Sequence, residues 1–152
     1  MDLDTGAFSQ LGTTGLLLSG LGVANGKIYG GATNGNTLYQ VNPSDGTLTP
    51  VGNGQISYYD TGSTTRGLYA LDSSMNLYSV DPLTGAATLI GSTGLQRPDT
   101  AGMSANSDTL YVTLDGNVYT INTTTAVPTF NRLWEPRVSR RLLPWQIMDS
   151  TQ

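Results

Sequence analysis

The chain has no cysteine and no histidine among its 152 residues. Without cysteine it can form no disulfide, no thiolate nucleophile and no Cys-ligated zinc site. Without histidine it can hold no Ser-His-Asp triad, no histidine base and no histidine-ligated metal. These two absences exclude the most common catalytic constellations, although they leave the compartment of the protein open.

Charged side chains are also scarce. They make up 12% of the residues, against about 25% in an average protein, and the net charge is −4. The basic residues before position 131 are scattered, at Lys27, Arg66 and Arg97. Binding to a phosphate backbone requires clustered lysine and arginine, so the sequence argues against nucleic acid as a partner.

Long apolar runs are missing as well. The longest aliphatic run is Leu16–Leu18, which is far too short to cross a bilayer. Asp2 and Asp4 follow Met1, where a signal peptide would carry positive charge. If the protein is exported, we expect its signal to lie upstream of this sequence.

What the chain does contain is a repeat with a period of about 40 residues. The period is marked by an aliphatic residue followed by tyrosine, and by a turn glycine. The markers are Ile28-Tyr29, Leu68-Tyr69 and Leu110-Tyr111; Leu38-Tyr39, Leu77-Tyr78 and Val118-Tyr119; and Gly6, Gly46 and Gly85. The 19 glycines and 22 threonines suit tight turns and short strands. A period of this size with strand-like units predicts a β-propeller.

Each repeat divides into four expected strands. The second repeat places three of them at 67–71, 77–81 and 87–91, after a first strand within Ile56–Tyr59. In the third repeat, Asp115 and Gly116 separate two apolar, β-branched runs. This pattern predicts a hairpin with a two-residue type I′ turn.

The predicted fold is all-β and propeller-like, with about three four-stranded antiparallel blades. The sequence divides into an orphan outer strand in 1–15, blades at 16–54, 55–94 and 95–131, and an atypical tail at 132–152. Propellers usually close with about four to eight blades. We therefore expect a fragment of a larger propeller, or a chain that self-associates through exposed blade faces.

The tail at 132–152 departs from the composition of the repeats. It holds four of the seven basic residues, both tryptophans and the single glutamate. Two interpretations stay open. The tail is either a genuine segment that packs on the propeller or binds a partner, or a translation artefact such as a frameshift.

The repeat also carries a resemblance to a known group of proteins. The stretch Leu77–Gly94, LYSVDPLTGAATLIGSTG, resembles the repeats of secreted bacterial β-propeller proteins, many of which carry a PEP-CTERM-type sorting tail. A weaker copy runs from Leu38 to Gly54, and the resemblance covers about residues 2 to 131. It implies an extracellular or cell-surface location. It carries over no catalytic residue, and no sorting tail is present in this sequence.

Four residues stand out as candidates for ligand binding. Most aspartates lie at expected turns, where they bond the backbone, but Asp60 and Asp99 lie near the first strands of repeats. Tyr58 and Tyr59 interrupt the regular tyrosine spacing, whereas the other six tyrosines are expected in the core between blades. Because inner strands line the central channel of a propeller, we predict Tyr58, Tyr59, Asp60 and Asp99 as ligand-binding residues. No catalytic or metal-binding residue is predicted.

The favoured function is non-enzymatic: an extracellular binding or scaffold propeller whose partner is an unidentified protein or glycan. One alternative is a fragment of a propeller hydrolase or lyase with paired carboxylates at the central channel. Another is a purely structural surface-layer or matrix protein. No cofactor is predicted, and calcium is the ion that turns rich in oxygen ligands would favour, although no EF-hand-like spacing is present.

Overall fold

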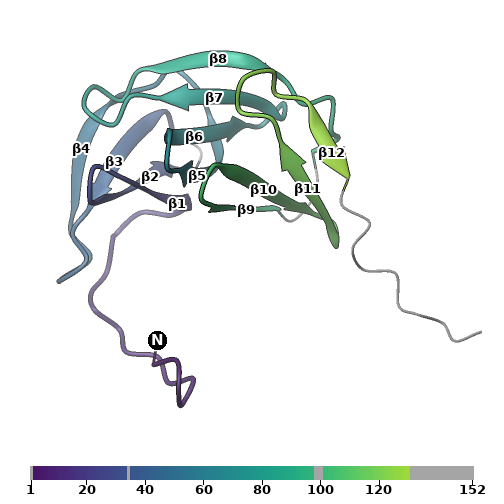
Figure 1. Ribbon diagram of the computed structural model, residues 1–152. Helices are drawn as coiled ribbons and strands as arrows, with labels where there is room; N and C mark the ends of the chain where they lie inside the picture. The colour runs from purple at the N-terminus through teal and green to yellow at the C-terminus, as the bar shows by residue number, and fades with distance from the viewer. Residues whose placement is uncertain (1, 34, 98–100, 131–152) are drawn as a thin grey trace, which may run out of the picture.

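The computed structural model describes residues 2–33, 35–97 and 101–130, which form twelve β-strands and no helix (Figure 1). The first sheet comprises β1 (Leu18–Ala24), β2 (Lys27–Ala32), β3 (Thr37–Val41) and β4 (Leu48–Asn53). The second comprises β5 (Tyr58–Thr64), β6 (Gly67–Asp72), β7 (Asn76–Val80) and β8 (Ala87–Ser92). The third comprises β9 (Ala101–Asn106), β10 (Thr109–Leu114), β11 (Asn117–Ile121) and β12 (Pro128–Phe130).

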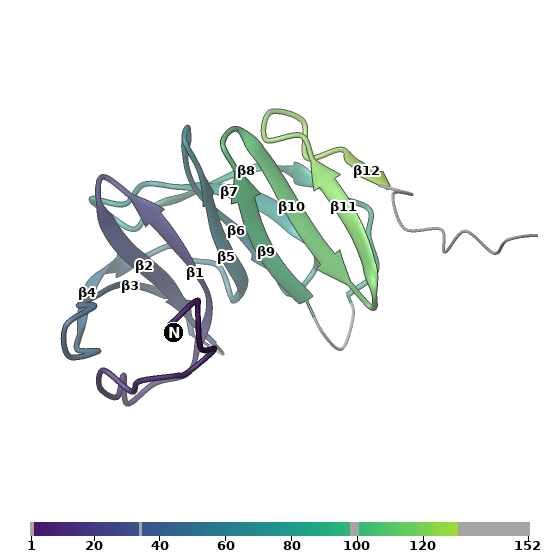
Figure 2. The same ribbon diagram turned by 60° about the horizontal axis from the view of Figure 1, so that its bottom comes forward.

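Each sheet is a four-stranded antiparallel meander in which the strands follow chain order. We call the sheets blades 1, 2 and 3. The blades stand face to face in a row, with β1, β5 and β9 along the inner edge, and β4 and β8 lie toward the outside of the arc (Figures 1 and 2). The all-β, three-bladed fold predicted from the repeat is confirmed.

The turns predicted from the sequence agree with the backbone φ angles. Asp115 and Gly116 have φ of 46° and 80°, both positive as a type I′ turn requires. Asn25 and Gly26 join β1 to β2 with φ of 51° and 71°. The predicted hairpin of the third repeat is therefore confirmed.

The first strand of the second repeat differs from the prediction. It runs over Tyr58–Thr64 rather than within Ile56–Tyr59. The segment after Tyr59 contains Asp60, Gly62 and Ser63, which are typical of turns, yet it pairs with β6 over its whole length. Burial between two neighbouring blades overrides the weak strand propensity of these small residues.

The core consists of two hydrophobic clusters, one between each pair of neighbouring blades. The first cluster is built from Tyr29, Leu38, Ile56, Tyr58, Leu68, Ala70 and Val80. The second is built from Tyr69, Leu71, Met75, Leu77, Met103, Leu110, Val112, Leu114, Ile121 and Ala126. Of the six tyrosines expected in the core, Tyr29 and Tyr69 are buried, and the other four are half-buried.

The segment before β1 repeats the turn of the blades without their strand. The Gly6 N–H donates to the Asp2 carbonyl at 2.9 Å, as the Gly85 N–H donates to the Asp81 carbonyl at 2.8 Å. Residues 7–14, where the sequence predicts the outer strand of a preceding blade, form no strand in this chain. Among the described residues, no strand lies beside them to complete a ladder.

The C-terminal tail at 132–152 lies outside the described residues, as does Asp99. Within the described ranges, no helix is long and apolar enough to span a membrane.

Candidate binding site at the loop end of the blades

The tyrosines that interrupt the repeat line a pocket where blades 1 and 2 meet. The pocket has a volume of about 360 Å³ and is lined by Thr33, Ser57, Tyr58, Tyr59, Ser73 and Arg97. These residues come from the β2–β3, β4–β5, β6–β7 and β8–β9 connections or the strand ends beside them. Because successive strands run in opposite directions, these connections all lie at one end of the blades. We call this site the loop pocket.

Arg97 and Tyr59 supply the main polar feature of the loop pocket. The guanidinium carbon of Arg97 lies 5.1 Å from the centroid of the Tyr59 ring, which is a cation–π contact. Arg97 is exposed and forms no ion pair with a carboxylate of the described residues. A guanidinium beside serine and threonine hydroxyls suits an anionic group, because it can donate two parallel hydrogen bonds to a carboxylate.

Arg97 was not singled out by the sequence. The available signal was that it is one of three basic residues before position 131 and lies in a connection between blades. Its importance depends on its contact with Tyr59, which is distant in the sequence but adjacent in the fold.

Tyr58 contributes to the pocket wall as part of the core. Its side chain is 2% exposed, and its ring lies against Gly31, where an added Cβ would overlap the ring. Its hydroxyl has no hydrogen-bond partner among the described residues, and burial raises the pKa of this hydroxyl to about 12. Tyr58 therefore stays neutral at physiological pH.

Asp60 does not join the tyrosines in the lining of the loop pocket. It is 4% exposed, and its Oδ1 accepts a hydrogen bond from the Thr61 N–H at 2.8 Å. Its Oδ2 has no partner within the part of the chain that the structure describes. Burial raises the pKa of this carboxyl, while the backbone N–H groups of Thr61 and Met103 oppose the rise. Asp60 is thus a buried acid on the inner strand β5.

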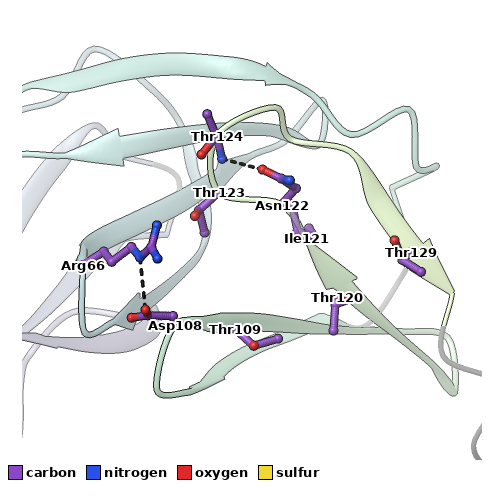
Figure 3. A pocket seen from close by; sticks show the side chains of 9 residues that line it. All are labelled: Arg66, Asp108, Thr109, Thr120, Ile121, Asn122, Thr123, Thr124 and Thr129. Atoms are coloured by element: carbon purple, nitrogen blue, oxygen red, sulfur yellow. Dashed lines mark hydrogen bonds and ion pairs between the residues drawn. The ribbon is translucent and has the colours of Figure 1, made fainter.

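A second pocket lies at the opposite end of the blades, where the hairpin turns are. Its volume is about 380 Å³, and it is lined by Arg66, Asp108, Thr109, Thr120, Ile121, Asn122, Thr123, Thr124 and Thr129 (Figure 3). We call it the threonine pocket. Arg66 and Asp108 point toward each other from separate hairpins, with Nε and Oδ2 3.2 Å apart. The hydroxyl of Thr65 also donates to Asp108.

The threonine pocket is less suited to an anion than the loop pocket. Its guanidinium is already paired with a carboxylate, and both side chains are about half exposed or more, so the pair itself adds little stability. The hydrogen bonds from Thr65 and Arg66 lower the pKa of Asp108, which keeps the carboxylate charged. Nothing in the sequence analysis had indicated this pocket.

Metal ligands are not clustered in the described ranges. No group of three or more aspartates or glutamates there is arranged to hold a metal ion. Calcium therefore remains a prediction of the sequence alone.

Comparison with known proteins supports the architecture. No protein-family model and no curated protein sequence matches the chain. Among solved structures, a Bacteroides thetaiotaomicron protein of unknown function superposes with a TM-score of 0.63 at 18% identity, over 76% of this chain and 33% of that one. Myxococcus xanthus glutaminyl cyclase superposes with a TM-score of 0.57 at 12% identity, over 74% and 52%.

Two further structures decide the fold. BamB from Moraxella catarrhalis gives a TM-score of 0.50 at 16% identity, over 76% of this chain and 37% of that one. YCF48 bound to D1 peptide gives 0.52 at 12% identity, over 76% and 40%. The fold is that of a β-propeller. The chain spans between a third and about half of the length of these four proteins.

Proposed function

We propose that this chain belongs to a binding propeller that holds a carboxylate-bearing ligand in the loop pocket. The observation that carries the proposal is the Arg97 guanidinium, stacked on Tyr59 among three hydroxyl-bearing side chains, Thr33, Ser57 and Ser73. The guanidinium would bind the carboxylate and the hydroxyls would bind neighbouring polar groups. An acidic glycan and an acidic peptide share this chemistry.

Among the four structures of similar fold, one is described as bound to a peptide and another is an enzyme, glutaminyl cyclase. YCF48, which shares the propeller fold, is a peptide-bound structure by its own description. The repeats resemble those of secreted bacterial propellers, and on this ground we propose that the binding site lies outside the cell or at its surface. Fractionation of cells that express the native gene, followed by immunoblotting, tests this location, and recovery in the cytosol alone would contradict it.

Loss of the Arg97 guanidinium should abolish most of the binding. We expect Arg97→Ala to weaken the affinity for oligogalacturonate or for an acidic peptide by about tenfold, the loss typical of a charge-assisted hydrogen bond. Arg97→Lys should recover part of it, since lysine keeps the charge but not the two-pronged geometry. Isothermal titration calorimetry measures both, and titrations with the two ligands distinguish glycan from peptide.

Arg66→Ala is the matched control for this experiment. It removes the arginine of the threonine pocket and should leave the affinity unchanged. Equal losses for Arg66→Ala and Arg97→Ala would point to general charge attraction rather than to the loop pocket. Absence of carboxylate binding at millimolar ligand would overturn the proposal itself.

One observation favours an enzyme as a second candidate. Asp60 is a buried carboxyl with a raised pKa on an inner strand, which is the environment of a proton donor. In that case Asp60 would act as the acid of a hydrolase or lyase, with the other catalytic groups on further blades. If the intact propeller has such an activity, Asp60→Asn abolishes it, and unchanged turnover removes this candidate.

A further inference from the structure

The two junctions between blades are built in the same way. We call the side of a blade that faces the preceding blade its front, and the opposite side its back. At the first junction, the back of blade 1 offers Tyr29 and Leu38, and the front of blade 2 offers Leu68 and Val80. The second junction joins the back of blade 2 to the front of blade 3 with residues in the same register.

The front of blade 1 carries the same apolar positions, but no other blade of the described chain packs on them. Ile28 pairs with Val41 as Leu68 pairs with Val80 in blade 2 and as Leu110 pairs with Ile121 in blade 3. The blade 2 and blade 3 residues are at most 4% exposed, whereas Ile28 and Val41 are half-buried. Leu21 on the same face is 54% exposed and lines an apolar hollow of about 310 Å³ with Val41.

The back of blade 3 is the complementary face. Tyr111 follows the register of Tyr29 and Tyr69, and Val118 follows that of Leu38 and Leu77. Leu38 and Leu77 are fully buried, while Val118 is 39% exposed. The described chain therefore ends in one uncovered front and one uncovered back, the two halves of the junction that it forms twice inside itself.

We propose that a second copy of this chain covers these faces head to tail, with the back of blade 3 against the front of blade 1. Each copy offers one front and one back, so two copies form two identical junctions and a ring of six blades. Such a contact is heterologous and closes when the rotation per copy completes a circle. Six blades lie within the range of about four to eight in which propellers close.

The segment before β1 fixes how the second copy fits. Gly12 lies on the Asp45 carbonyl, as Gly52 lies on the Thr84 carbonyl, and both leave no room for a Cβ. Residues 8–12 thus occupy the outer-strand position of the blade that would precede blade 1. When blade 3 of the second copy docks at this position, its β9, β10 and β11 form the three inner strands of that blade. Residues 8–12 of the first copy then pair with this β11 and displace the short β12 of the second copy.

Sedimentation velocity tests the association. We expect a dimer of the unmodified chain in the range of about 1 to 100 µM, where stable protein interfaces are populated. Leu21→Arg on the front and Val118→Arg on the back should each raise the dimer dissociation constant at least tenfold. Both sites are more than a third exposed, so neither change should unfold the chain. The matched control Leu83→Arg, on an exposed turn away from both faces, should leave the dimer intact.

Mixing the two variants reveals the head-to-tail arrangement. Leu21→Arg keeps a normal back and Val118→Arg keeps a normal front, so an equimolar mixture recovers one junction and forms dimers. A front-to-front contact would instead leave Val118→Arg dimeric on its own and would overturn the proposal. A chain that stays monomeric across the range, or a mixture that stays monomeric, also overturns it.

Strand exchange can be tested by cross-linking, because the chain has no cysteine of its own. Ser9 follows the register of Thr129, which lies opposite Thr120 on β11. Cross-strand Cα distances of about 4.5 to 5.5 Å suit a disulfide. Ser9→Cys with Thr120→Cys should therefore give a disulfide-linked dimer on oxidation. The control pair Ser9→Cys with Ser79→Cys should not, because β8 already covers Ser79, and equal cross-linking of both pairs would contradict the exchange.

Discussion

Replacing Gly52 with alanine will lower the free energy of unfolding by about 3 kcal/mol, at the upper end of the cost of overpacking. Gly52 lies in β4, and a Cβ at this position would overlap the carbonyl oxygen of Thr84 in the β7–β8 turn of blade 2. Both partners are backbone, so the clash cannot be relieved by a side-chain rotation. Either the outer strand of blade 1 or the turn of blade 2 has to move.

Gly91→Ala is the matched control for Gly52→Ala. Gly91 occupies the same repeat position in β8, but its added Cβ would lie 3.3 Å from the Ala126 Cβ, a contact that a small shift relieves. We expect a loss below about 1 kcal/mol, since alanine also lowers the entropy of the unfolded chain. Urea unfolding followed by circular dichroism measures both variants. Equal losses would show that the Thr84 carbonyl does not limit packing at this junction.

Replacing Asp60 with asparagine will raise the free energy of unfolding at pH 7 by about 2 kcal/mol, the cost of an unsatisfied buried charged group. The Asp60 Oδ2 has no partner among the described residues. Asparagine keeps an oxygen for the Thr61 N–H and cannot ionise, so folding no longer requires a buried charge or the uptake of a proton at this position. The inner strand should therefore be more stable with the amide than with the carboxylate.

The gain from Asp60→Asn should depend on pH. Burial raises the pKa of Asp60 in the folded protein above its value in the unfolded chain. The folded state therefore binds this proton more tightly, and Asp60 costs stability as pH rises through its folded pKa. The difference between the two proteins should be largest at neutral pH and shrink toward about pH 4, the unfolded pKa of aspartate. Urea unfolding at both pH values measures it.

Asp115→Asn is the control for the charge change, because Asp115 lies in an exposed type I′ turn that asparagine also favours. We expect no change in stability there at either pH. A lower stability of Asp60→Asn at pH 7 would contradict the account above. It would mean that the carboxylate is held by a favourable interaction inside the fold.

The repeat strands could be predicted because their tyrosines and β-branched residues pack on broad blade faces. The inner strand β5 could not be predicted, because its residues are determined by the close approach of neighbouring inner strands. The inner strands approach so closely that a Cβ at Gly22 would lie 3.0 Å from the Gly62 backbone, so small residues are required. A stretch of glycine, serine and aspartate is typical of turns. The sequence pattern does not indicate that these residues are crowded by a neighbouring blade.

The candidate site shows a similar limit. Tyr58 and Tyr59 could be predicted from the sequence because they interrupt the tyrosine spacing, and both line the loop pocket. The role of Tyr58 in the core could not be anticipated, since it depends on space left by Gly31 in the neighbouring blade. Arg97 could not be predicted either, because its role also depends on a contact made only in the fold. Its contact with Tyr59 joins two connections whose proximity follows from the stacking of blades and not from any local motif.

The chain-order pairing of the strands has a consequence for how such a protein can change its size. In the part of the chain that the structure describes, every hydrogen-bonded strand pair joins neighbours in the sequence, and no strand crosses from one blade to another. A duplicated gene segment of about 40 residues, inserted in frame between Asn53 and Tyr58, would add a blade without altering the partner of any existing strand. The architecture is therefore open to growth and loss by whole units, through unequal recombination between its own repeats.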